Sequence, residues 1–292
     1  MDWWQPRPLG RSGITTSRLG LGSSYGVGER DVERAIERGV TYLYWGSRRR
    51  DGFGRAIARA ARRDRAKLCV VVQSYSRTAF SLGPSLDLAL RRLGTEYADA
   101  LLLGWWNSEP PARILDRARE LVDAGKARSV MVSCHHRPTF ASYIAEPAYD
   151  SIMVRYNAAH RGAETEVFPA LARQARPPGV VAYTATRWGA LLDRSVVPAA
   201  ESLPRASDCY RFALSRPEVD VVLAGPANGA ELDEAMTALD RGPMSADELA
   251  WMHRVGDAVR SMTAAAATRS GNVPALWERI TGLAERVRSR FS

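Results

Sequence analysis

Short apolar runs alternate along the chain with longer segments in which apolar residues recur at helical spacing. The apolar runs predict eight strands, at residues 19–22, 40–44, 68–72, 100–103, 130–133, 151–155, 180–184 and 219–223. Helical patterns follow them at residues 29–37, 54–62, 82–93, 112–124, 139–144, 164–175, 206–214 and 229–239. Strands that alternate with helices favour a parallel sheet, because parallel pairs need crossover connections.

The alternation predicts an α/β fold, specifically a (β/α)8 TIM barrel. The strand runs are continuously apolar, as expected of parallel strands that are covered on both faces. An open, doubly wound sheet is the alternative. However, Gly20 and Gly22 lie within the first strand, and with Gly26 and Gly28 they do not form the Gly-x-Gly-x-x-Gly fingerprint of dinucleotide-binding sheets.

Both ends of the chain extend beyond the eight units. The dipeptide Ser12-Gly13 is a turn signal, and we expect a β-hairpin there that plugs the amino-terminal end of the barrel. Residues 264–267 and 271–272 have the composition of a linker, and residues 275–291 predict an amphipathic helix packed on the barrel. We therefore expect a single domain over 1–292, with the barrel and hairpin at 8–240 and a helical extension at 241–292.

Composition places the chain among globular proteins. It has 292 residues, of which 46% are hydrophobic and 25% charged, and it has no apolar run of about 18 residues that could span a membrane. The amino terminus lacks the pattern of a secretory signal, and the three widely spaced cysteines form no disulfide framework. We therefore expect a cytoplasmic protein.

The formal net charge is +9, from 41 basic and 32 acidic residues. Only Lys67 and Lys126 are lysines, so 39 (41 − 2) of the basic residues are arginines. Such a charge could attract nucleic acid. We do not expect nucleic-acid binding, because the arginines are scattered over predicted helix surfaces and no recognition motif is present.

Several segments carry a family resemblance. They are, in order, LGRSG at 9–13 with SRLGLG at 17–22, the helix and strand at 35–42, LDLALRRLGTEYAD at 86–99, AGKARSVMVS at 124–133, YN with RGAE at 156–164, VAYT at 181–184 and VVLAG at 221–225. Together they resemble the aldo-keto reductase superfamily over about residues 8–240. The resemblance implies a (β/α)8 barrel that reduces carbonyl groups with a nicotinamide cofactor, NADP(H), and without a metal.

The resemblance also implies a catalytic tetrad of Asp, Tyr, Lys and His at the carboxyl ends of the strands. Tyrosine donates the proton, lysine lowers the pKa of the tyrosine, aspartate pairs with lysine, and histidine orients the carbonyl. A phenol has an ordinary pKa of about 10, so it needs a nearby cation to exchange protons at neutral pH.

None of the four tetrad positions carries the family residue. In the order Asp, Tyr, Lys and His, the positions fall on Tyr44, Arg49, Gln73 and Gly104. Shifting the alignment by one residue brings Ser74, not a lysine, to the third position. We expect neither lysine of the chain to reach the site, because Lys67 precedes the third strand and Lys126 lies in a turn at the opposite end of the barrel.

The implied cofactor site is only partly retained. The matching positions are Ser133, for the carboxamide, Tyr183, whose ring would stack on the nicotinamide, and Thr184, for the phosphate. Two other carboxamide positions are changed, to Cys134 and Met153, and residues 225–235 lack the basic residues that hold a 2′-phosphate. We expect NADP(H) binding to be weakened or lost. The alternative for the three matching residues is simple inheritance with the fold.

Other residues near the predicted mouth suggest chemistry outside the family pattern. The arginines at 48–50 are predicted to lie beside four tryptophans, Trp45, Trp105, Trp106 and Trp188, which suits an anionic or aromatic ligand. A solvated charge run beside packing tryptophans is the alternative. The sequence Cys134-His135-His136 could hold a nucleophilic pair, but neighbouring residues of an extended segment point in opposite directions. We expect no metal site.

Three functions remain open from the sequence. The leading hypothesis is a ligand-binding pseudoenzyme or a non-redox enzyme, of the isomerase or cyclase type, in which Tyr44 is the acid and Arg49 stabilises an anion. The second is an NAD(P)H-dependent oxidoreductase that uses a different proton donor. The third is an interacting subunit that uses its basic carboxyl-terminal helix.

Overall fold

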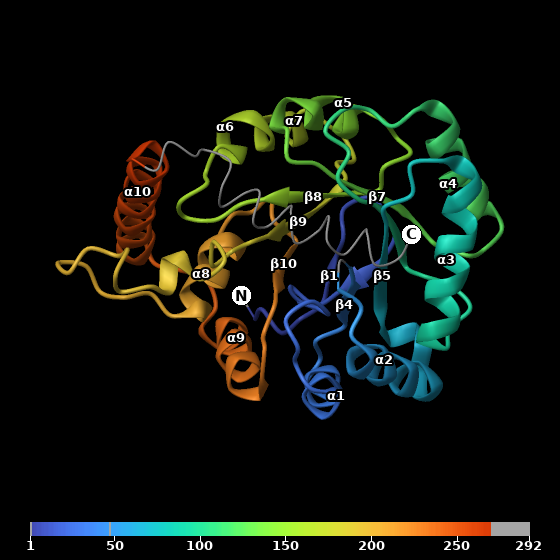
Figure 1. Ribbon diagram of the computed structural model, residues 1–292, viewed down its shortest axis with the longest axis horizontal. Coiled ribbons are helices and arrows are strands. Elements are labelled where there is room, and N and C mark those ends of the chain that lie inside the picture. The colour runs from blue at the N-terminus through green and yellow to red at the C-terminus, as the bar shows by residue number, and fades with distance from the viewer. Residues whose placement is uncertain (1, 47, 270–292) are drawn as a thin grey trace.

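Eight parallel strands close into a barrel in the computed structural model, which describes residues 2–46 and 48–269 (Figure 1). The strands are β3 (Leu19–Gly22), β4 (Tyr42–Trp45), β5 (Cys69–Ser74), β6 (Ala100–Leu103), β7 (Val130–Ser133), β8 (Ser151–Arg155), β9 (Gly179–Tyr183) and β10 (Val221–Ala224). Each pairs in parallel with the next, and β10 pairs with β3 to complete the ring. The predicted (β/α)8 barrel is confirmed.

Helices follow the strands and surround the barrel (Figure 1). They are α1 (Glu29–Glu37), α2 (Asp51–Asp64), α3 (Ala79–Leu93), α4 (Ala112–Asp123), α5 (Phe140–Ala145), α6 (Ala163–Glu166), α7 (Phe168–Leu171), α8 (Ala206–Leu214), α9 (Gly229–Arg241) and α10 (Ala246–Arg269), with 3-10 turns η1 (Arg65–Lys67), η2 (Arg137–Thr139) and η3 (Ala190–Leu192). The single helix expected over 164–175 was wrong. The segment instead forms two short helices, α6 and α7, which are interrupted at Val167 because Pro169 has no N–H to continue the helix.

Side chains along each strand alternate between the barrel interior and the layer beneath the helices. On β4, Tyr42 and Tyr44 belong to the interior cluster, whereas Leu43 and Trp45 pack under the helices. The alternation follows from the pleat, in which successive side chains point to opposite faces. Consequently Tyr44 points into the barrel, and Trp45 stacks against Phe53 of α2.

The expected hairpin closes the amino-terminal end of the barrel. Strand β1 (Arg7–Pro8) pairs antiparallel with β2 (Thr15–Thr16), and the turn between them carries Leu9 and Ile14 into the interior cluster. Gly10, with φ of 51°, bridges to Pro178. A Cβ at Gly10 would lie 1.9 Å from the backbone nitrogen of Gly179, so only glycine permits this close approach.

Helix α10 packs outside the barrel against α8 and η3 (Figure 1). It includes residues 264–267, so the linker expected there was wrong; the segment is a run of alanines, the strongest helix former. A Cβ at Gly256 would lie 2.1 Å from the carbonyl oxygen of Ala158, so the helix backbone packs directly on the loop after β8. The helix expected at 275–291 and the linker at 271–272 lie outside the described residues.

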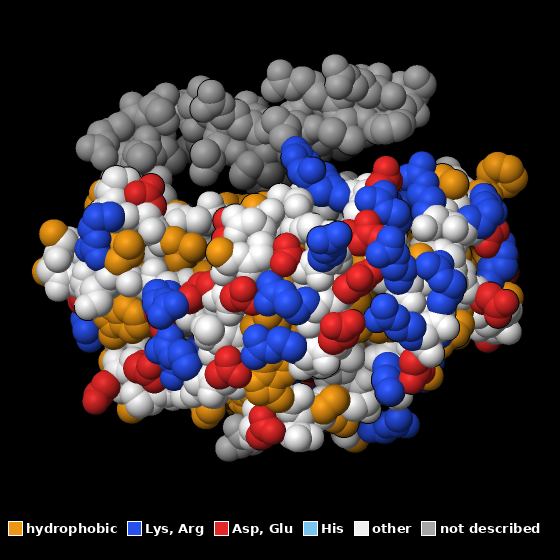
Figure 2. All heavy atoms as spheres, turned by 90° about the horizontal axis from the view of Figure 1, so that it is seen from below, with side chains coloured by type: hydrophobic (Ala, Val, Ile, Leu, Met, Phe, Trp, Pro, Cys, Tyr) orange, Lys and Arg blue, Asp and Glu red, His pale blue; other side chains and the backbone are white. Residues whose placement is uncertain are grey.

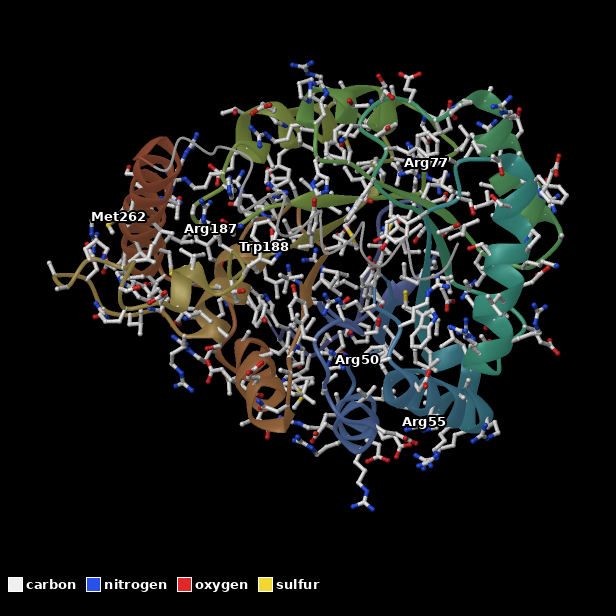
Figure 3. The ribbon with its side chains drawn as sticks, viewed as in Figure 1. Arg50, Arg55, Arg77, Arg187, Trp188 and Met262 are labelled. Atoms are coloured by element: carbon white, nitrogen blue, oxygen red, sulfur yellow. The ribbon has the colours of Figure 1, made fainter. Side chains whose placement is uncertain are left out.

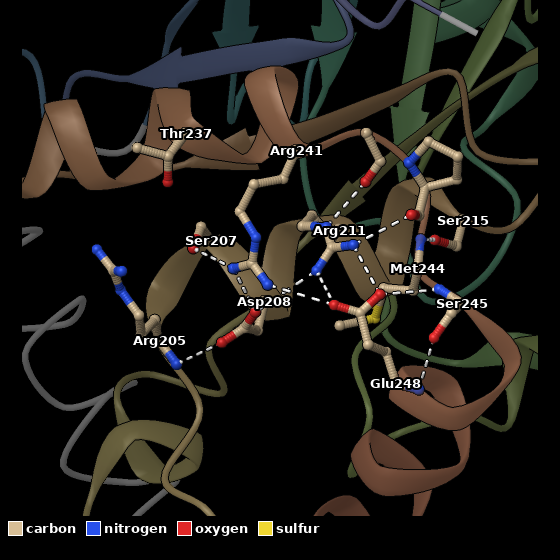
Figure 4. A network of polar contacts seen from close by, with 12 residues as sticks. Arg205, Ser207, Asp208, Arg211, Ser215, Thr237, Arg241, Met244, Ser245 and Glu248 are labelled. Atoms are coloured by element: carbon tan, nitrogen blue, oxygen red, sulfur yellow. Dashed lines mark hydrogen bonds and ion pairs between the residues drawn. The ribbon is translucent and has the colours of Figure 1, made fainter.

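A buried arginine ties α8, α9 and α10 together (Figure 4). Arg211 is 3% exposed and donates to both carboxylate oxygens of Glu248, at 2.5 and 2.8 Å, and to two backbone carbonyls of the connection between α9 and α10. Arg241 of α9 joins the network through Asp208, at 2.6 Å, and Glu248, at 3.3 Å. The network therefore fixes the beginning of α10.

Charges on the outer helices are mostly paired. Three arginines of α2 contact three glutamates of α1, in the pairs Arg55–Glu29, Arg59–Glu33 and Arg63–Glu37. Figure 2 shows basic and acidic side chains interspersed over the face that it displays. Within the described residues, no helix combines the length and the apolar character needed to cross a membrane.

Replacing Glu248 by glutamine should destabilise the protein by about 1–3 kcal/mol at neutral pH, because Arg211 loses its main charged acceptor in a buried place. Hydrogen bonds from Arg211 lower the pKa of Glu248 to about 2, from an ordinary 4.5. The contribution is therefore present above pH 4.5 and is lost as the pH falls toward 2. Urea unfolding across this range should show a smaller acid loss in Glu248→Gln than in the parent.

The matched control is Glu37→Gln, which removes a pair whose two side chains are each 64% exposed. This change should alter the unfolding free energy by less than about 1 kcal/mol. Equal effects of the two substitutions would contradict the role given to Glu248.

Candidate functional site

The residues expected at the first three tetrad positions meet at the carboxyl ends of β4 and β5. The amide oxygen of Gln73 accepts hydrogen bonds from the hydroxyls of Tyr44 and Tyr75, the latter at 3.1 Å. The guanidinium of Arg49 donates to the backbone carbonyl of Gln73. Gln73 is 1% exposed and Tyr44 is 7% exposed. A buried amide thus stands where the resemblance implies a lysine.

The fourth tetrad position completes the same cluster. A Cβ at Gly104 would lie 2.2 Å from the amide nitrogen of Gln73 and 3.0 Å from the ring of Tyr75. The side chains of Gln73 and Tyr75 therefore fill the space that a larger residue at position 104 would need. We name Tyr44, Arg49, Gln73 and Tyr75, with Gly104, the glutamine cluster.

Both lysines lie away from this cluster. Lys67 precedes β5 and pairs with Asp64 at 3.2 Å. Lys126 precedes β7 and pairs with Asp87 at 2.6 Å. Each lies at the amino-terminal side of its strand, which in a parallel barrel is the end opposite the mouth.

A second polar cluster lies at the ends of β7, β8 and β9. Arg155 and Tyr183 are register partners on β8 and β9. The Nδ1 atom of His135 lies 2.9 Å from the Tyr183 hydroxyl and 3.1 Å from Nη2 of Arg155. A guanidinium only donates, so Nδ1 carries no hydrogen and also accepts from Tyr183. We name these three residues the histidine cluster.

Burial favours the uncharged forms of both His135 and Tyr183 in the histidine cluster. Burial, followed by the charge of Arg155, lowers the pKa of His135 to about 4. Burial raises the pKa of Tyr183 to about 12, while Arg155 acts in the opposite direction. At neutral pH the imidazole is therefore uncharged and the phenol is protonated, which is the state required of a proton donor.

Aromatic rings connect the two clusters across the mouth. The ring of Trp105 lies 5.2 Å from that of Tyr75, centroid to centroid, and 5.8 Å from the imidazole of His135. The imidazole in turn lies 6.1 Å from the ring of Tyr183. The mouth thus has a row of aromatic surfaces beside its polar groups, an arrangement suited to a small organic ligand.

Strained backbone marks the loops that carry this row. Four non-glycine residues have positive φ, between 52° and 59°, and they are Trp105, Thr184, Arg187 and Trp188. All four follow β6 or β9. Such conformations persist only where the surroundings hold them, and they cluster at functional sites. Their position supports a functional role for the mouth.

Two of the three residues expected at the cofactor site, Ser133 and Thr184, form hydrogen bonds with the backbone of these loops. Ser133 Oγ accepts the backbone N–H of Trp105 at 3.0 Å. The hydroxyl of Thr184 donates to the carbonyl of Tyr183 at 2.6 Å, and Asn157 donates to the carbonyl of Thr184 at 2.8 Å. Ser133 and Thr184 therefore shape the two strained loops, and Tyr183 belongs to the histidine cluster.

The expected grouping of arginines 48–50 with four tryptophans was wrong for Trp45. Trp45 is 1% exposed and lies under α2, because its position on β4 points away from the interior. Instead, the guanidinium of Arg77 lies 4.3 Å from the ring centre of Trp106, and that of Arg155 lies 5.2 Å from the ring centre of Trp188. Arg77 and Arg155 therefore also provide contacts of arginine with tryptophan at the mouth.

Cys134 and its neighbouring histidines form no nucleophilic pair. The Cys134 thiol contacts the carbonyl of His136 at 3.1 Å, whereas His135 points to the histidine cluster. Burial raises the pKa of the Cys134 thiol. Over residues 2–46 and 48–269, no three side chains of His, Cys, Asp or Glu gather as metal ligands.

Comparison with known proteins places this barrel among its relatives. The aldo/keto reductase family model matches residues 29–207, more than half of the chain. The chain belongs to the aldo/keto reductase family. The matched range contains all four tetrad positions as well as Ser133, Tyr183 and Thr184.

Solved aldo/keto reductases share the fold. The holo form of an aldo-keto reductase from Bacillus halodurans superimposes with a TM-score of 0.74 at 20% identity, over 86% of this chain and 96% of that one. An aldo/keto reductase from Klebsiella pneumoniae, in complex with NADP and acetate, gives 0.71 at 20% identity, over 87% and 96%. A putative 2,5-diketo-D-gluconic acid reductase B gives 0.69 at 20% identity, over 87% and 92%. At this identity, the likeness establishes the fold.

Sequence reasoning did not single out Tyr75 or Arg155 in this aldo/keto reductase family member. A signal for Arg155 was available, since it ends a predicted strand, and the carboxyl ends of barrel strands carry functional groups. His160 and Arg187 were also not identified. No sequence signal was available for Arg187, because its direction depends on the strained turn after β9.

Gly104→Ala should destabilise the protein by about 1–3 kcal/mol, because the new methyl group displaces the amide of Gln73 from its bond to Tyr44. Adding Gln73→Ala should cost less than the sum of the two single changes, since the shortened side chain leaves room for the methyl. Urea unfolding of the parent, both single variants and the double variant measures this coupling.

Gly22→Ala is the matched control, because its Cβ would meet no atom closer than 3.5 Å. It should cost less than Gly104→Ala. Strictly additive effects at positions 73 and 104 would contradict the packing described.

Proposed function

We propose that the barrel mouth binds a small molecule and that the protein does not carry out lysine-assisted carbonyl reduction. The observation that carries this proposal is the glutamine cluster, in which the neutral amide of Gln73, at the position where the resemblance implies a lysine, accepts a hydrogen bond from Tyr44. An amide cannot supply the positive charge that lowers the pKa of a phenol. The place of the family histidine is filled by the same side chain.

The cluster suits ligand binding or proton transfer without a redox step. Tyr44 provides a hydroxyl that points into the barrel, and Arg49 provides a guanidinium fixed to the backbone of Gln73. Burial, followed by the charge of Arg92, lowers the pKa of Arg49, yet its ordinary value of 12.5 leaves it charged at neutral pH. In an isomerase or cyclase, Tyr44 would be the acid, and Arg49 would stabilise the anion that forms.

Weakened nicotinamide binding belongs to the same proposal. The hydroxyls of Ser133 and Thr184 are engaged with the backbone of their own loops. The first turn of α9, where the sequence lacks the basic residues for a 2′-phosphate, carries Glu231, whose carboxylate accepts the N–H of Ala227. A negative charge at this position would repel a phosphate.

A direct test combines cofactor titration with a turnover assay. We expect no saturable quenching of tryptophan fluorescence by NADPH or NADH at micromolar concentration. We also expect no loss of NADPH absorbance above the protein-free rate with a panel of aldehydes and ketones. Turnover at ordinary enzyme rates, about 1–10³ s⁻¹, would contradict the proposal.

A second candidate is an NAD(P)H-dependent oxidoreductase with a proton donor outside the family tetrad. The observation that favours it is the histidine cluster, in which Tyr183 is held by His135 with Arg155 beside it. Similar structures contain NADP or NADPH, so the fold accommodates this cofactor in those proteins. In this reading Tyr183 donates the proton, and Arg155 stabilises the phenolate that remains.

Tyr183→Phe separates the two candidates. If the second candidate holds, this change should lower NADPH-dependent turnover by about 10²-fold or more, because it removes the proton donor. The parent rate should be flat between the pKa of His135, about 4, and that of Tyr183, about 12. Tyr44→Phe is the matched control. A larger loss in Tyr44→Phe than in Tyr183→Phe would exclude Tyr183 as the donor.

A further inference from the structure

Three arginines from three elements interact electrostatically at the side of the mouth nearest α10. Arg155 ends β8, Arg187 follows β9, and Arg260 lies on α10. Arg187 donates to the imidazole of His160 and, at 2.6 Å, to the hydroxyl of Thr263 on α10. After burial, the charges of Arg155 and Arg260 are the causes that lower the pKa of Arg187, so the three guanidiniums lie within electrostatic range.

Other arginines on this side of the barrel are balanced by acids. The pairs are Arg137–Glu166 and Arg161–Asp257, both at 2.8 Å, and Arg254–Glu201, at 2.7 Å. Over the part of the chain that the structure describes, no carboxylate lies within 4.0 Å of Arg187 or Arg260. Positive charge is therefore concentrated here without an acidic partner for these two side chains.

The partner that Arg187 does have leaves its charge intact. Burial, followed by the charges of Arg187, Arg155, Arg260 and Arg137, lowers the pKa of His160 to about 4. At neutral pH this imidazole is uncharged, and it accepts a hydrogen bond from the guanidinium without neutralising its charge. A carboxylate in its place would cancel the charge. The arrangement orients Arg187 and keeps it available to an anion from outside the chain.

An aromatic side chain lies beside these charges. Trp188 is 42% exposed. Figure 3 shows Arg187 and Trp188 between the barrel and α10. Arg155 lies over the ring of Trp188. Positive φ at both Arg187 and Trp188 shows that a strained turn presents the two side chains together.

We propose that Arg155, Arg187, Arg260 and Trp188, which we name the arginine wall, bind the phosphate or carboxylate group of a ligand that has an aromatic body. This inference rests on the proposed function, small-molecule binding at the mouth. Guanidinium groups match the oxygens of phosphate and carboxylate, and indole offers a flat apolar surface to a ring. The anionic ring ligand could be a free substrate or the nucleotide end of a dinucleotide.

Calorimetric titration of the full chain with phenyl phosphate tests the wall. Inorganic phosphate and benzyl alcohol present the anion and the ring separately, and both should bind more weakly than phenyl phosphate. Arg187→Gln should weaken phenyl phosphate binding about tenfold or more, because a charge-assisted contact is lost. Arg187→Lys should recover part of that loss, since it keeps the charge. Trp188→Leu should lower the affinity for phenyl phosphate but leave the affinity for inorganic phosphate unchanged.

Arg260→Gln is a second variant of the wall that should fold normally, because Arg260 is exposed and its side chain bonds to no other described residue. It should also lower the affinity for phenyl phosphate. Arg38→Gln is the matched control, since Arg38 lies 5.1 Å from the ring centre of Trp4, away from the mouth. It should leave the affinity unchanged. Unchanged affinity in both folded Arg187→Gln and Arg260→Gln, or no phenyl phosphate binding at 10 mM (about 10⁴ times a Kd of about 1 μM), would overturn the proposal.

Competition with NADPH identifies the source of the anion. If NADPH displaces phenyl phosphate, the wall takes the phosphate of a dinucleotide, and the expectation of weak cofactor binding fails while the wall stands. If phenyl phosphate binds and NADPH does not displace it, the wall takes a separate anionic substrate. The two proposals can also fail independently. Absence of phenyl phosphate binding would overturn the arginine wall, and NADPH-dependent carbonyl turnover would overturn the proposed function.

Discussion

Closure of the parallel strand ring is the constraint on which this molecule depends. Because β10 pairs with β3, every strand presents its last residue at the same rim. Arg155 and Tyr183 are 28 residues apart in the chain yet are register partners on β8 and β9. Parallel pairing also forces each crossover helix to the outside, so that the rim is left to loops. The candidate site lies at this rim because barrel closure brings the strand ends together there.

The rim divides into two chemically different halves. On the side of β4, β5 and β6, the amide of Gln73 joins two tyrosine hydroxyls and fills the space beside Gly104. On the side of β7, β8 and β9, His135 joins a phenol and a guanidinium. The first half holds an amide, with Arg49 beside it, where the family resemblance implies a lysine, whereas the second holds Arg155 and a protonated phenol. The two functions considered for this chain therefore use different halves of the rim.

Helix α10 links stability to this rim. The bidentate contact between Arg211 and Glu248 fixes its beginning, and the close approach at Gly256 sets its backbone against the loop after β8. The helix then brings Arg260 and Thr263 to Arg187. Placing three guanidiniums together costs free energy, because like charges repel in a partly desolvated setting. A bound anion would offset this repulsion among the guanidiniums.

The sequence by itself determined the fold and the family. Apolar runs and helical stripes are local patterns, and the alternation of the two leaves few topologies open, so the barrel and its hairpin followed from residues alone. The lysine count did not depend on any alignment. Errors arose where local patterns compete, as at Pro169, which interrupts an apolar stripe, and at residues 264–267, where alanines continue a helix.

Only the tertiary structure decided which side chains meet. Strand pleat directed Trp45 away from the mouth and Tyr44 into it, a difference of one residue in register. The contacts of Gln73 with Tyr44 and of His135 with Tyr183 join segments 29 and 48 residues apart. The turn after β9 points Arg187 toward α10, 76 residues further along the chain. Such meetings depend on barrel closure and on strained loop conformations, which no local sequence pattern encodes.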